Sequence, residues 1–341
     1  MNRLRNRTIR LPRIAFEVTR SCNLDCRYCY NPWKRQESTR KGDWTFADAR
    51  RTLLRLRSQA DVGSITFTGG EPLLAERFLE LALACRVRRR GVTIITNGNA
   101  GSADTYDVLL AMGVRQFQIP LLSSTPSIHD ELTRGEGSWE RARESIRYLV
   151  ANGAMVTGVI VLTAMNRMEA GTTMTMLASL GVRHLMVNRF NIGGSGIAEA
   201  GRLALTRTEL RESLLQVNVC ASTLGIPVSS NVSVPHCVVE PREVRSIHLT
   251  SCGTCASDKP LTLDAGGDLR LCNHSPVILG NIAESYIGEM LDLPYVRRFH
   301  ETVPVPCRAC KFYGECRGGC RAAAEQLGLP LESGDPLLAA G

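Results

Sequence analysis

Residues 14–29 read IAFEVTRSCNLDCRYC, and this stretch decides the fold class. Its first six residues are mainly apolar and β-branched, which predicts a buried strand. Three cysteines follow at once, Cys22, Cys26 and Cys29, separated by three and then two residues. In parallel α/β folds the chemistry gathers at the carboxyl ends of the strands. The three thiols therefore lie where such a fold carries its site.

Outward from this stretch, short β-rich runs alternate with longer amphipathic runs as far as residue 188, a pattern typical of βα units with a parallel sheet. The six predicted strands cover residues 14–19, 64–68, 92–96, 116–121, 155–162 and 184–188. The predicted helices cover residues 45–59, 73–89, 104–112, 138–152, 168–180 and 208–224, and Gly113, Gly153 and Gly181 end three of them. Six units are fewer than the eight of a full barrel, so the sequence predicts an α/β fold with a partial (β/α)6 TIM-like barrel.

The remaining chain divides the molecule further. Residues 1–13 form a basic segment, residues 14–205 the partial barrel, and residues 206–236 a helical linker. From residue 237 to residue 341 the periodicity fades into short strands, turns and cysteine pairs. Such a composition predicts a small domain held together by metal rather than by a large core.

Composition excludes several classes of protein. The chain has 341 residues, of which 44% are apolar and 22% charged, as expected for a globular protein of about two domains. No apolar run reaches the ~18 residues of a membrane span, and the N-terminus lacks the apolar stretch of a signal peptide, so we expect a cytoplasmic protein. The aromatic content of 5% argues against nucleic-acid binding. Phosphate-loop, dinucleotide, serine-hydrolase and zinc-protease motifs are absent from the sequence.

Thirteen cysteines point to metal or redox chemistry, because a cytoplasmic chain gains little from disulfides. Three thiolates suit an iron-sulfur cluster and leave one iron of a [4Fe-4S] cube open to a small molecule. A structural zinc site needs a fourth ligand, and the next cysteine is the distant Cys85. A thioredoxin-like pair leaves Cys22 unexplained. Cys85 and Cys220 lie in helical patterns and are interpreted as core residues.

The spacing C-x3-C-x2-C, with Tyr28 before the third cysteine, resembles the radical S-adenosylmethionine (radical SAM) superfamily. The resemblance implies that Cys22, Cys26 and Cys29 hold the cluster whose open iron binds the amino and carboxylate groups of S-adenosylmethionine. After the second strand, Gly69-Gly70-Glu71 resembles the family motif that meets the methionine amino group. Glycine permits such a close approach because it has no Cβ.

The same resemblance implies further contacts with the cofactor. Thr96-Asn97 matches a loop near it, Arg134 an arginine that pairs with its carboxylate, and Asn188-Arg189 a segment that approaches the adenosine. One departure stands out: many relatives end the fourth strand with Ser-Leu-Asp-Gly, whereas this chain has Pro120-Leu121-Leu122-Ser123. We expect Ser123 or Ser124 to substitute for the missing serine.

The last third carries a second group of cysteines that resembles the SPASM domain found after many radical SAM enzymes, which holds two auxiliary [4Fe-4S] clusters. The resemblance implies one cluster on Cys252, Cys255, Cys272 and Cys320, and another on Cys307, Cys310 and Cys316. The family's final cysteine is missing after Cys320. The second cluster then has an open iron, or takes Asp335, Glu332 or Cys237 as its fourth ligand. Cys237 is alternatively a free thiol or a catalytic acid. A zinc ribbon on the pairs Cys252/Cys255 and Cys307/Cys310 would leave three cysteines idle.

The resemblance implies reductive cleavage of S-adenosylmethionine to a 5′-deoxyadenosyl radical, which abstracts a substrate hydrogen. With auxiliary clusters to accept an electron, we expect oxidative modification of a ribosomal peptide or protein residue, such as a crosslink or a desaturation. The implied partners are an electron donor such as flavodoxin or ferredoxin and, since few residues precede Cys22, a separate leader-binding protein, unless the auxiliary domain itself recognises the leader. The N-terminal arginines at positions 3, 5, 7, 10 and 13 offer an alternative contact for an acidic leader.

Two other hypotheses remain. In one, the same radical chemistry dehydrogenates a small molecule such as a sugar alcohol or a tetrapyrrole. In the other, the chain is a non-enzymatic iron-sulfur or zinc scaffold, which leaves Gly69-Gly70-Glu71 without a purpose.

Overall fold

The computed structural model describes residues 8–34, 43–253 and 260–338. They form two compact units, each assembled from separate stretches of the chain. The first unit contains residues 8–23, 43–117, 253 and 260–301, and the second contains residues 24–34, 118–252 and 302–338. The predicted domains, with boundaries after residues 13, 205 and 236, are continuous stretches of the chain. They stay a prediction.

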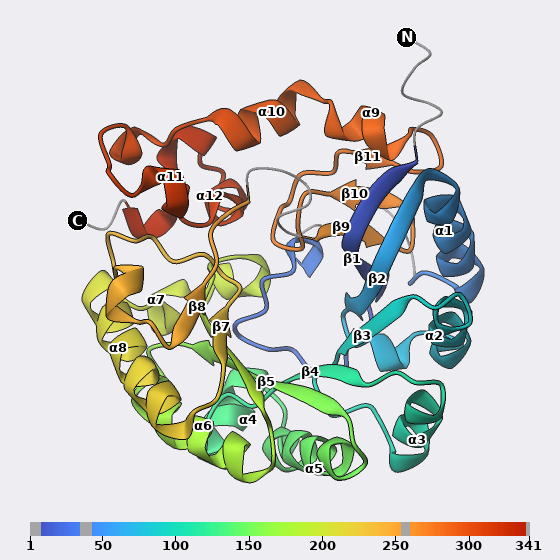
Figure 1. The fold of residues 1–341 in the computed structure, drawn as a ribbon, viewed down its shortest axis with the longest axis horizontal. Coiled ribbons are helices and arrows are strands. Elements are labelled where there is room, and N and C mark those ends of the chain that lie inside the picture. Colours follow the sequence, from blue (N-terminus) through green and yellow to red (C-terminus); the bar gives the residue numbers. More distant parts are fainter. Residues whose placement is uncertain (1–7, 35–42, 254–259, 339–341) are drawn as a thin grey trace. The chain divides into compact units, whose positions relative to one another are not determined.

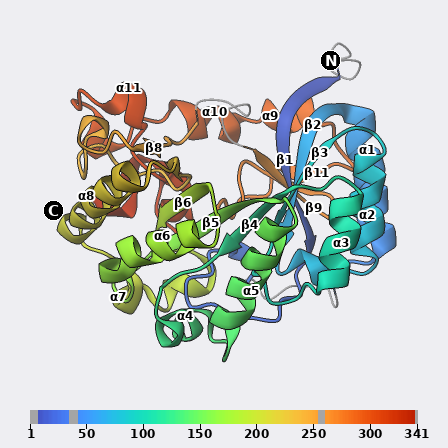
Figure 2. The ribbon, with the colours of Figure 1, turned by 60° about the horizontal axis from the view of Figure 1, so that its bottom comes forward.

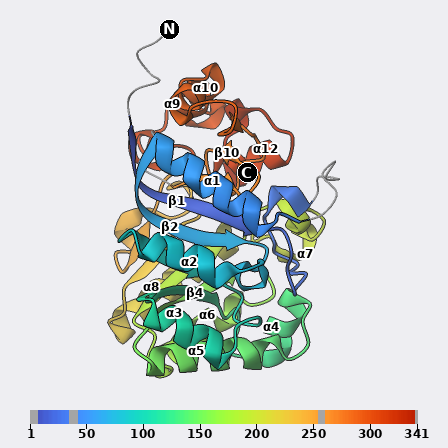
Figure 3. The ribbon, with the colours of Figure 1, turned by 90° about the vertical axis from the view of Figure 1, so that its right-hand side faces the viewer.

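The first unit is built on parallel strands. Its order is β11-β10-β9-β1-β2-β3, in which β1 pairs in parallel with both β2 and β9, while β10 pairs antiparallel with β9 and β11. Figure 3 shows α1 and α2 side by side along these strands. The elements are β1 (Ile9–Thr19), α1 (Phe46–Gln59), β2 (Ala60–Gly69), α2 (Phe78–Arg86), β3 (Gly91–Ile95), α3 (Ala103–Ala111), β9 (Leu261–Asp264), β10 (Asp268–Arg270), β11 (Gly280–Asn281), α9 (Ile287–Leu291) and α10 (Pro294–Glu301).

The second unit repeats the βα pattern. Strands β5, β6, β7 and β8 pair in parallel in that order, and α6 packs against α8 (Figures 1 and 2). Strand β4 (Gln116–Pro120) spans the division between the units. The elements are α4 (Pro126–Thr133), α5 (Ser138–Ala151), β5 (Met155–Leu162), α6 (Ala170–Ser179), β6 (His184–Arg189), α7 (Ala200–Leu203), α8 (Arg207–Leu224), β7 (Val228–Ser230), β8 (Ile247–Leu249), α11 (Tyr313–Cys316) and α12 (Arg321–Gln326).

All six predicted strands are present, as β1 to β6, and the predicted α/β class with parallel strands is confirmed. Helix α1 begins at Thr45, whose side chain accepts from the Asp48 amide while Asp48 caps the Thr45 amide in return. Such a capping box satisfies donors that a helix start leaves unpaired. Helices α3, α5 and α6 each end two residues before the predicted glycine stop.

The short helices α7 and α9 to α12 were not predicted, and two helices of the βα region differ from the prediction. The helix predicted over residues 73–89 is a short 3-10 turn, Pro72–Leu74, followed by the separate helix α2. Arg77 stands between them in the left-handed region, with a φ of 52°, and such a residue interrupts a right-handed helix. Helix α4 was not predicted, because its eight residues are too few for a clear helical period.

Each unit has its own apolar core. In the first, Phe67 packs edge-on against Phe16 and Phe78, with ring centroids 6.0 and 5.3 Å away. In the second, a buried cluster of Leu122, Leu132, Phe190 and Leu203 packs against Tyr28, the aromatic residue of the cysteine motif. No helix within the described ranges combines the length and hydrophobicity of a membrane-spanning segment.

Candidate functional site

In the second unit, Arg27 fixes the loop that carries Cys26 and Cys29. Its backbone amide donates to the carbonyl of Leu132 (2.9 Å) and its Nε donates to the carbonyl of Glu131 (3.1 Å). Both carbonyls belong to the last turn of α4, where a helix leaves its acceptors unpaired and partly negative. The loop is therefore anchored to the end of α4, midway between two of the predicted cluster ligands.

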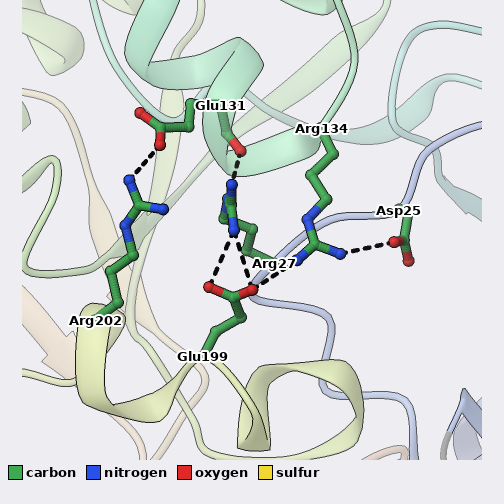
Figure 4. Close-up of polar contacts among 6 residues, drawn as sticks. All are labelled: Asp25, Arg27, Glu131, Arg134, Glu199 and Arg202. Atoms are coloured by element: carbon green, nitrogen blue, oxygen red, sulfur yellow. Dashed lines mark hydrogen bonds and ion pairs between the residues drawn. The ribbon is translucent and has the colours of Figure 1, made fainter.

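A network of charged side chains surrounds this anchor (Figure 4). Glu199 accepts from Arg27 at 3.0 Å and from Arg134 at 2.6 Å, and Arg134 also pairs with Asp25 at 2.9 Å. Arg202 pairs with Glu131 on the same side of α4. Arg134, predicted to bind the cofactor carboxylate, thus already holds two carboxylates, but its side chain is 41% exposed and reachable from solvent.

The far end of the cysteine loop is held by the glycine-rich segment. The amide of Gly196 donates to the carbonyl of Cys29 (3.1 Å). Gly194 has a φ of +50°, and a Cβ at that position would lie 2.6 Å from the Cys29 carbonyl oxygen and 2.5 Å from that of Asn31. Gln326 closes the arrangement, because it donates to the Tyr30 carbonyl at 2.9 Å and accepts from the Gly194 amide at 2.7 Å. The sequence identified only a loop here, and the contact with Cys29 was missed.

Replacing Gly194 with alanine is expected to destabilise the protein by at least about 2 kcal/mol, because the left-handed backbone and the clash with two carbonyl oxygens act together. Gly201 is the matched control, since a Cβ there meets no atom within 4 Å. Thermal unfolding of the cluster-free protein measures both. Equal melting temperatures for Gly194→Ala and Gly201→Ala would contradict the close fit described here.

In the first unit, Gly69-Gly70-Glu71 lies against the end of β1. The amide of Gly70 donates to the Thr19 carbonyl and that of Glu71 to the Ser21 carbonyl, both at 2.8 Å. A Cβ on Gly70 would stand 2.1 Å from the Ser21 carbonyl oxygen. Only glycine fits where residue 70 passes the carbonyl of Ser21, the residue directly before Cys22.

Glu71 is fully buried and held by three donors. The Thr96 hydroxyl donates to it at 2.8 Å, the Asn97 amide at 2.7 Å and the Leu73 amide at 3.2 Å. The Asn97 side chain continues the chain of contacts toward the Cys22 sulfur, 3.9 Å from its Nδ2. Burial raises the pKa of Glu71 to about 7, although its hydrogen bonds counteract the rise. The predicted residues Gly69, Gly70, Glu71, Thr96, Asn97 and Cys22 are thus brought together.

The raised pKa of Glu71 predicts a pH-dependent stability in the cluster-free protein. The folded state binds a proton more tightly than the unfolded state, whose glutamate titrates near 4.5. Stability is therefore full below pH 4.5 and falls as the pH rises through 7, by about 3 kcal/mol in all. Denaturant unfolding from pH 4 to pH 8 measures this slope. Glu71→Gln should remove it, the exposed control Glu136→Gln should keep it, and parallel curves for both variants would refute the assignment.

Three other predicted contacts have protein partners in the second unit. The buried Ser123 hydroxyl donates to Glu169, and Asn188 Oδ1 accepts from the amides of Asn231 (2.7 Å) and Val232 (3.2 Å). Arg189 is buried, donates to the Ser233 carbonyl at 3.0 Å and forms an ion pair with Asp335. These side chains order loops in the structure, and their contacts with a cofactor stay a prediction.

Sequence reasoning missed a buried charge cluster in the first unit. Glu17 on β1 stands in register with Asp264 on β9, and Arg270 on β10 pairs with Glu17 at 2.5 Å. Burial, together with the nearby Asp268 and Glu17, raises the pKa of Asp264 to about 6. The signal was present, because Glu17 interrupts an otherwise apolar strand, and a buried charge needs a partner. An acid with such a pKa is a candidate proton donor or acceptor at neutral pH.

The C-terminal cysteines are divided between the units. Cys307, Cys310, Cys316 and Cys320 belong to the second, where all but Cys310 are buried, as does the part-buried Cys252. Cys272 belongs to the first unit, and Cys255 lies outside the described residues. The Asn191 amide group donates to the Cys320 sulfur at 3.3 Å. Within the described ranges, no three His, Cys, Asp or Glu side chains converge closely enough to hold a single metal ion.

Comparison with known proteins adds to this geometry. Over 333 residues the chain is 26% identical to the mycofactocin maturase MftC of Mycobacterium tuberculosis. The match covers 95% of this chain and 81% of MftC. Over 336 residues it is 23% identical to the PqqA peptide cyclase of Xanthomonas campestris, with 95% and 85% covered.

Two solved structures share the fold. SuiB of Streptococcus suis, bound to the precursor peptide SuiA, matches with a TM-score of 0.73 at 17% identity and covers 96% of this chain and 76% of its own. The enzyme anSMEcpe with bound AdoMet matches with a TM-score of 0.68 at 16% identity, over 92% and 90% of the two chains. The model of the radical SAM superfamily matches residues 16–177, the span that contains the three-cysteine loop and Glu71. Residues 16–177 of this chain therefore form a radical SAM domain.

Proposed function

We propose that this enzyme oxidatively modifies a residue of a ribosomally made peptide or protein, by a crosslink, a desaturation or a similar change. The observation that carries the radical SAM part is the chain of contacts from the buried Glu71 through Asn97 to Cys22. The peptide part is supported by the relatives, since MftC is a maturase, the PqqA cyclase is named for its peptide, and SuiB was solved with its precursor peptide.

Cys22, Cys26 and Cys29 are the proposed ligands of the first [4Fe-4S] cluster. The donor set fits, because three thiolates leave one iron for the amino and carboxylate groups of S-adenosylmethionine. When bound, the cluster supplies the electron that cleaves S-adenosylmethionine and yields the radical that takes a hydrogen atom from the substrate. Arg27 and Gly196 set the positions of Cys26 and Cys29 before any cofactor arrives.

Glu71 is the proposed acceptor for the methionine ammonium group. Gly69 and Gly70 let the backbone pass close by, while Thr96 and Asn97 orient the carboxylate. A cation beside Glu71 favours its ionised form, so its pKa falls when the cofactor binds and its proton is released. At neutral pH the buried carboxyl is thus about half protonated in the cofactor-free protein, and binding of the ammonium group would shift it to the ionised form.

The other proposed contacts are Tyr28, Ser123, Arg134, Asn188 and Arg189. Arg134 is the most accessible of them, and the cofactor carboxylate would replace Glu199 or Asp25 on its guanidinium. Tyr28 packs on the apolar cluster of the second unit and so attaches the cysteine loop to it. Ser123, Asn188 and Arg189 would exchange a present partner for the cofactor.

Two auxiliary [4Fe-4S] clusters complete the proposal. Cys252, Cys255, Cys272 and Cys320 would ligate the first, and Cys307, Cys310 and Cys316 the second. Burial of three of these thiols and the N–H···S contact at Cys320 suit thiolate ligands, whose potential is tuned by such hydrogen bonds. Their role would be to accept an electron from the substrate radical, which makes the outcome oxidative.

The proposed partners are an electron donor such as flavodoxin or ferredoxin and a separate leader-binding protein, and the proposed location is the cytoplasm.

The function is tested with anaerobically reconstituted protein, dithionite, S-adenosylmethionine and the peptides encoded beside this gene. We expect 5′-deoxyadenosine and a peptide lighter by two hydrogen atoms, with Cys26→Ala as the inactive control. An unchanged peptide, together with oxidation of a sugar alcohol or a tetrapyrrole, would overturn the peptide assignment and favour a small-molecule substrate.

A further inference from the structure

Three cysteines of the second unit lie on successive turns of one short segment. The Cys310 amide donates to the Cys307 carbonyl (3.1 Å), and the Cys316 amide donates to the Phe312 carbonyl (2.8 Å). Cys307 and Cys316 are buried, and Cys310 is partly exposed. This segment provides three thiols where a cubane requires four ligands in all.

A tight turn more than sixty residues earlier in the chain packs on this segment. The Val238 amide donates to the Pro235 carbonyl at 2.8 Å, which closes the turn around His236 and Cys237. The backbone amide of His236 donates to the Cys316 sulfur at 3.3 Å. Its ring meets Phe312 edge-on, with centroids 6.3 Å apart. Two separate contacts therefore hold the residue next to Cys237 against the cysteine segment.

The position of Cys237 is also fixed from the other side. Its carbonyl accepts from Arg207 at the start of α8, at 3.3 Å. Cys237 itself is exposed, whereas the neighbouring His236 is buried, so the turn directs one residue into the core and leaves the thiol-bearing residue at the surface.

The four thiols lie close enough together to interact electrostatically. A cubane binds each thiolate to a different iron, so its ligands stand further apart than those of a single ion.

The carboxylate alternative is engaged elsewhere. Asp335 is fully buried, pairs with Arg189, and accepts from the amides of Cys320 (2.6 Å) and Leu337 (2.9 Å). Ligation of iron by Asp335 would leave the Arg189 guanidinium buried without its counter-charge, and such a loss is expensive.

We propose that Cys237 is the fourth thiolate of the iron-sulfur cluster on Cys307, Cys310 and Cys316. It takes the place of the cysteine that SPASM domains carry after Cys320, and each thiol releases one proton on ligation. The inference rests on the auxiliary clusters of the proposed function and goes beyond them. A cluster closed by four thiolates has no iron open to substrate, so its role is electron transfer.

The test compares full-length wild type, Cys237→Ala and the control Cys220→Ala after anaerobic reconstitution, by iron content and EPR. At about four irons per cubane, three clusters predict roughly twelve irons in wild type and control. Cys237→Ala should lose between about one and about four irons. If only one iron is lost, the oxidised form should show the signal of a three-iron cluster. Since Cys237 is exposed, the circular dichroism spectrum should be unchanged. Glu332→Ala, which removes the remaining carboxylate alternative, should retain all its iron.

Wild-type iron content and spectra in Cys237→Ala would overturn the inference and leave the second cluster standing. Loss of iron in Glu332→Ala would overturn it in favour of a carboxylate ligand. If Cys310→Ala binds as much iron as wild type, Cys307, Cys310 and Cys316 hold no cluster, and the second auxiliary cluster fails together with the inference.

Discussion

Protein in which Cys22, Cys26 and Cys29 are replaced together by alanine should bind about eight irons instead of about twelve and form no 5′-deoxyadenosine. All three ligands of one cluster are removed, while the C-terminal cysteines remain. Without that cluster no electron reaches S-adenosylmethionine, so the loss of cleavage should be complete rather than partial. Iron and sulfide per chain, with 5′-deoxyadenosine measured by chromatography, check both parts.

The matched control is Cys220→Ala on α8, which should retain wild-type iron and full cleavage activity. Zinc in place of iron in the wild type would refute the cluster assignment. So would a triple variant that still produces 5′-deoxyadenosine. Retention of about eight irons in the triple variant would also show that the auxiliary clusters assemble independently of the first.

Asp335→Asn should lower the free energy of unfolding by about 3–5 kcal/mol, the range found when a buried ion pair loses one partner. Arg189 and Asp335 are 5% and 0% exposed, so the remaining guanidinium has no water to replace the carboxylate. Burial raises the pKa of Asp335, and Arg189 and two backbone amides counteract that rise. Asparagine keeps the size of the side chain, which separates the loss of charge from the formation of a cavity. Denaturant unfolding of the cluster-free protein measures the effect.

The control is Glu144→Gln, which breaks the exposed pair with Arg147 on α5 and should leave the unfolding midpoint unchanged. Equal effects of the two substitutions would mean that the buried pair contributes no more than a surface one. Loss of iron by Asp335→Asn at full stability would instead indicate that Asp335 is a cluster ligand.

The strands were predictable because each is a short apolar run closed by a turn, and the pattern of β5 reproduces its observed bounds. Glu71, Thr96 and Asn97 were also predictable as a group, since they follow neighbouring parallel strands and must meet at one edge. Helix α4 was not predicted because its eight residues, about two helical turns, carry little periodicity.

The partners of Arg134, Ser123 and Arg189 could not be predicted. Each pairs with a carboxylate far along the chain, and the separations are 65, 46 and 146 residues for Glu199, Glu169 and Asp335. A single sequence contains nothing that connects such positions. Cys237 is the opposite case, because its residue type suggested a ligand, and only the folded turn showed which cysteines it accompanies.

The contact between Gln326 and Tyr30 has a consequence for biosynthesis. The two residues are separated by 296 positions, so the support of the cysteine loop is completed only after Gln326 has been made. At about 5–20 residues per second, a ribosome needs roughly 15–60 s to travel that distance. During this interval Cys26 and Cys29 have been synthesised but lack their final scaffold, and they are open to oxidation and to the wrong metal. Delivery of iron and sulfide should therefore follow the synthesis of Gln326 rather than that of Cys29.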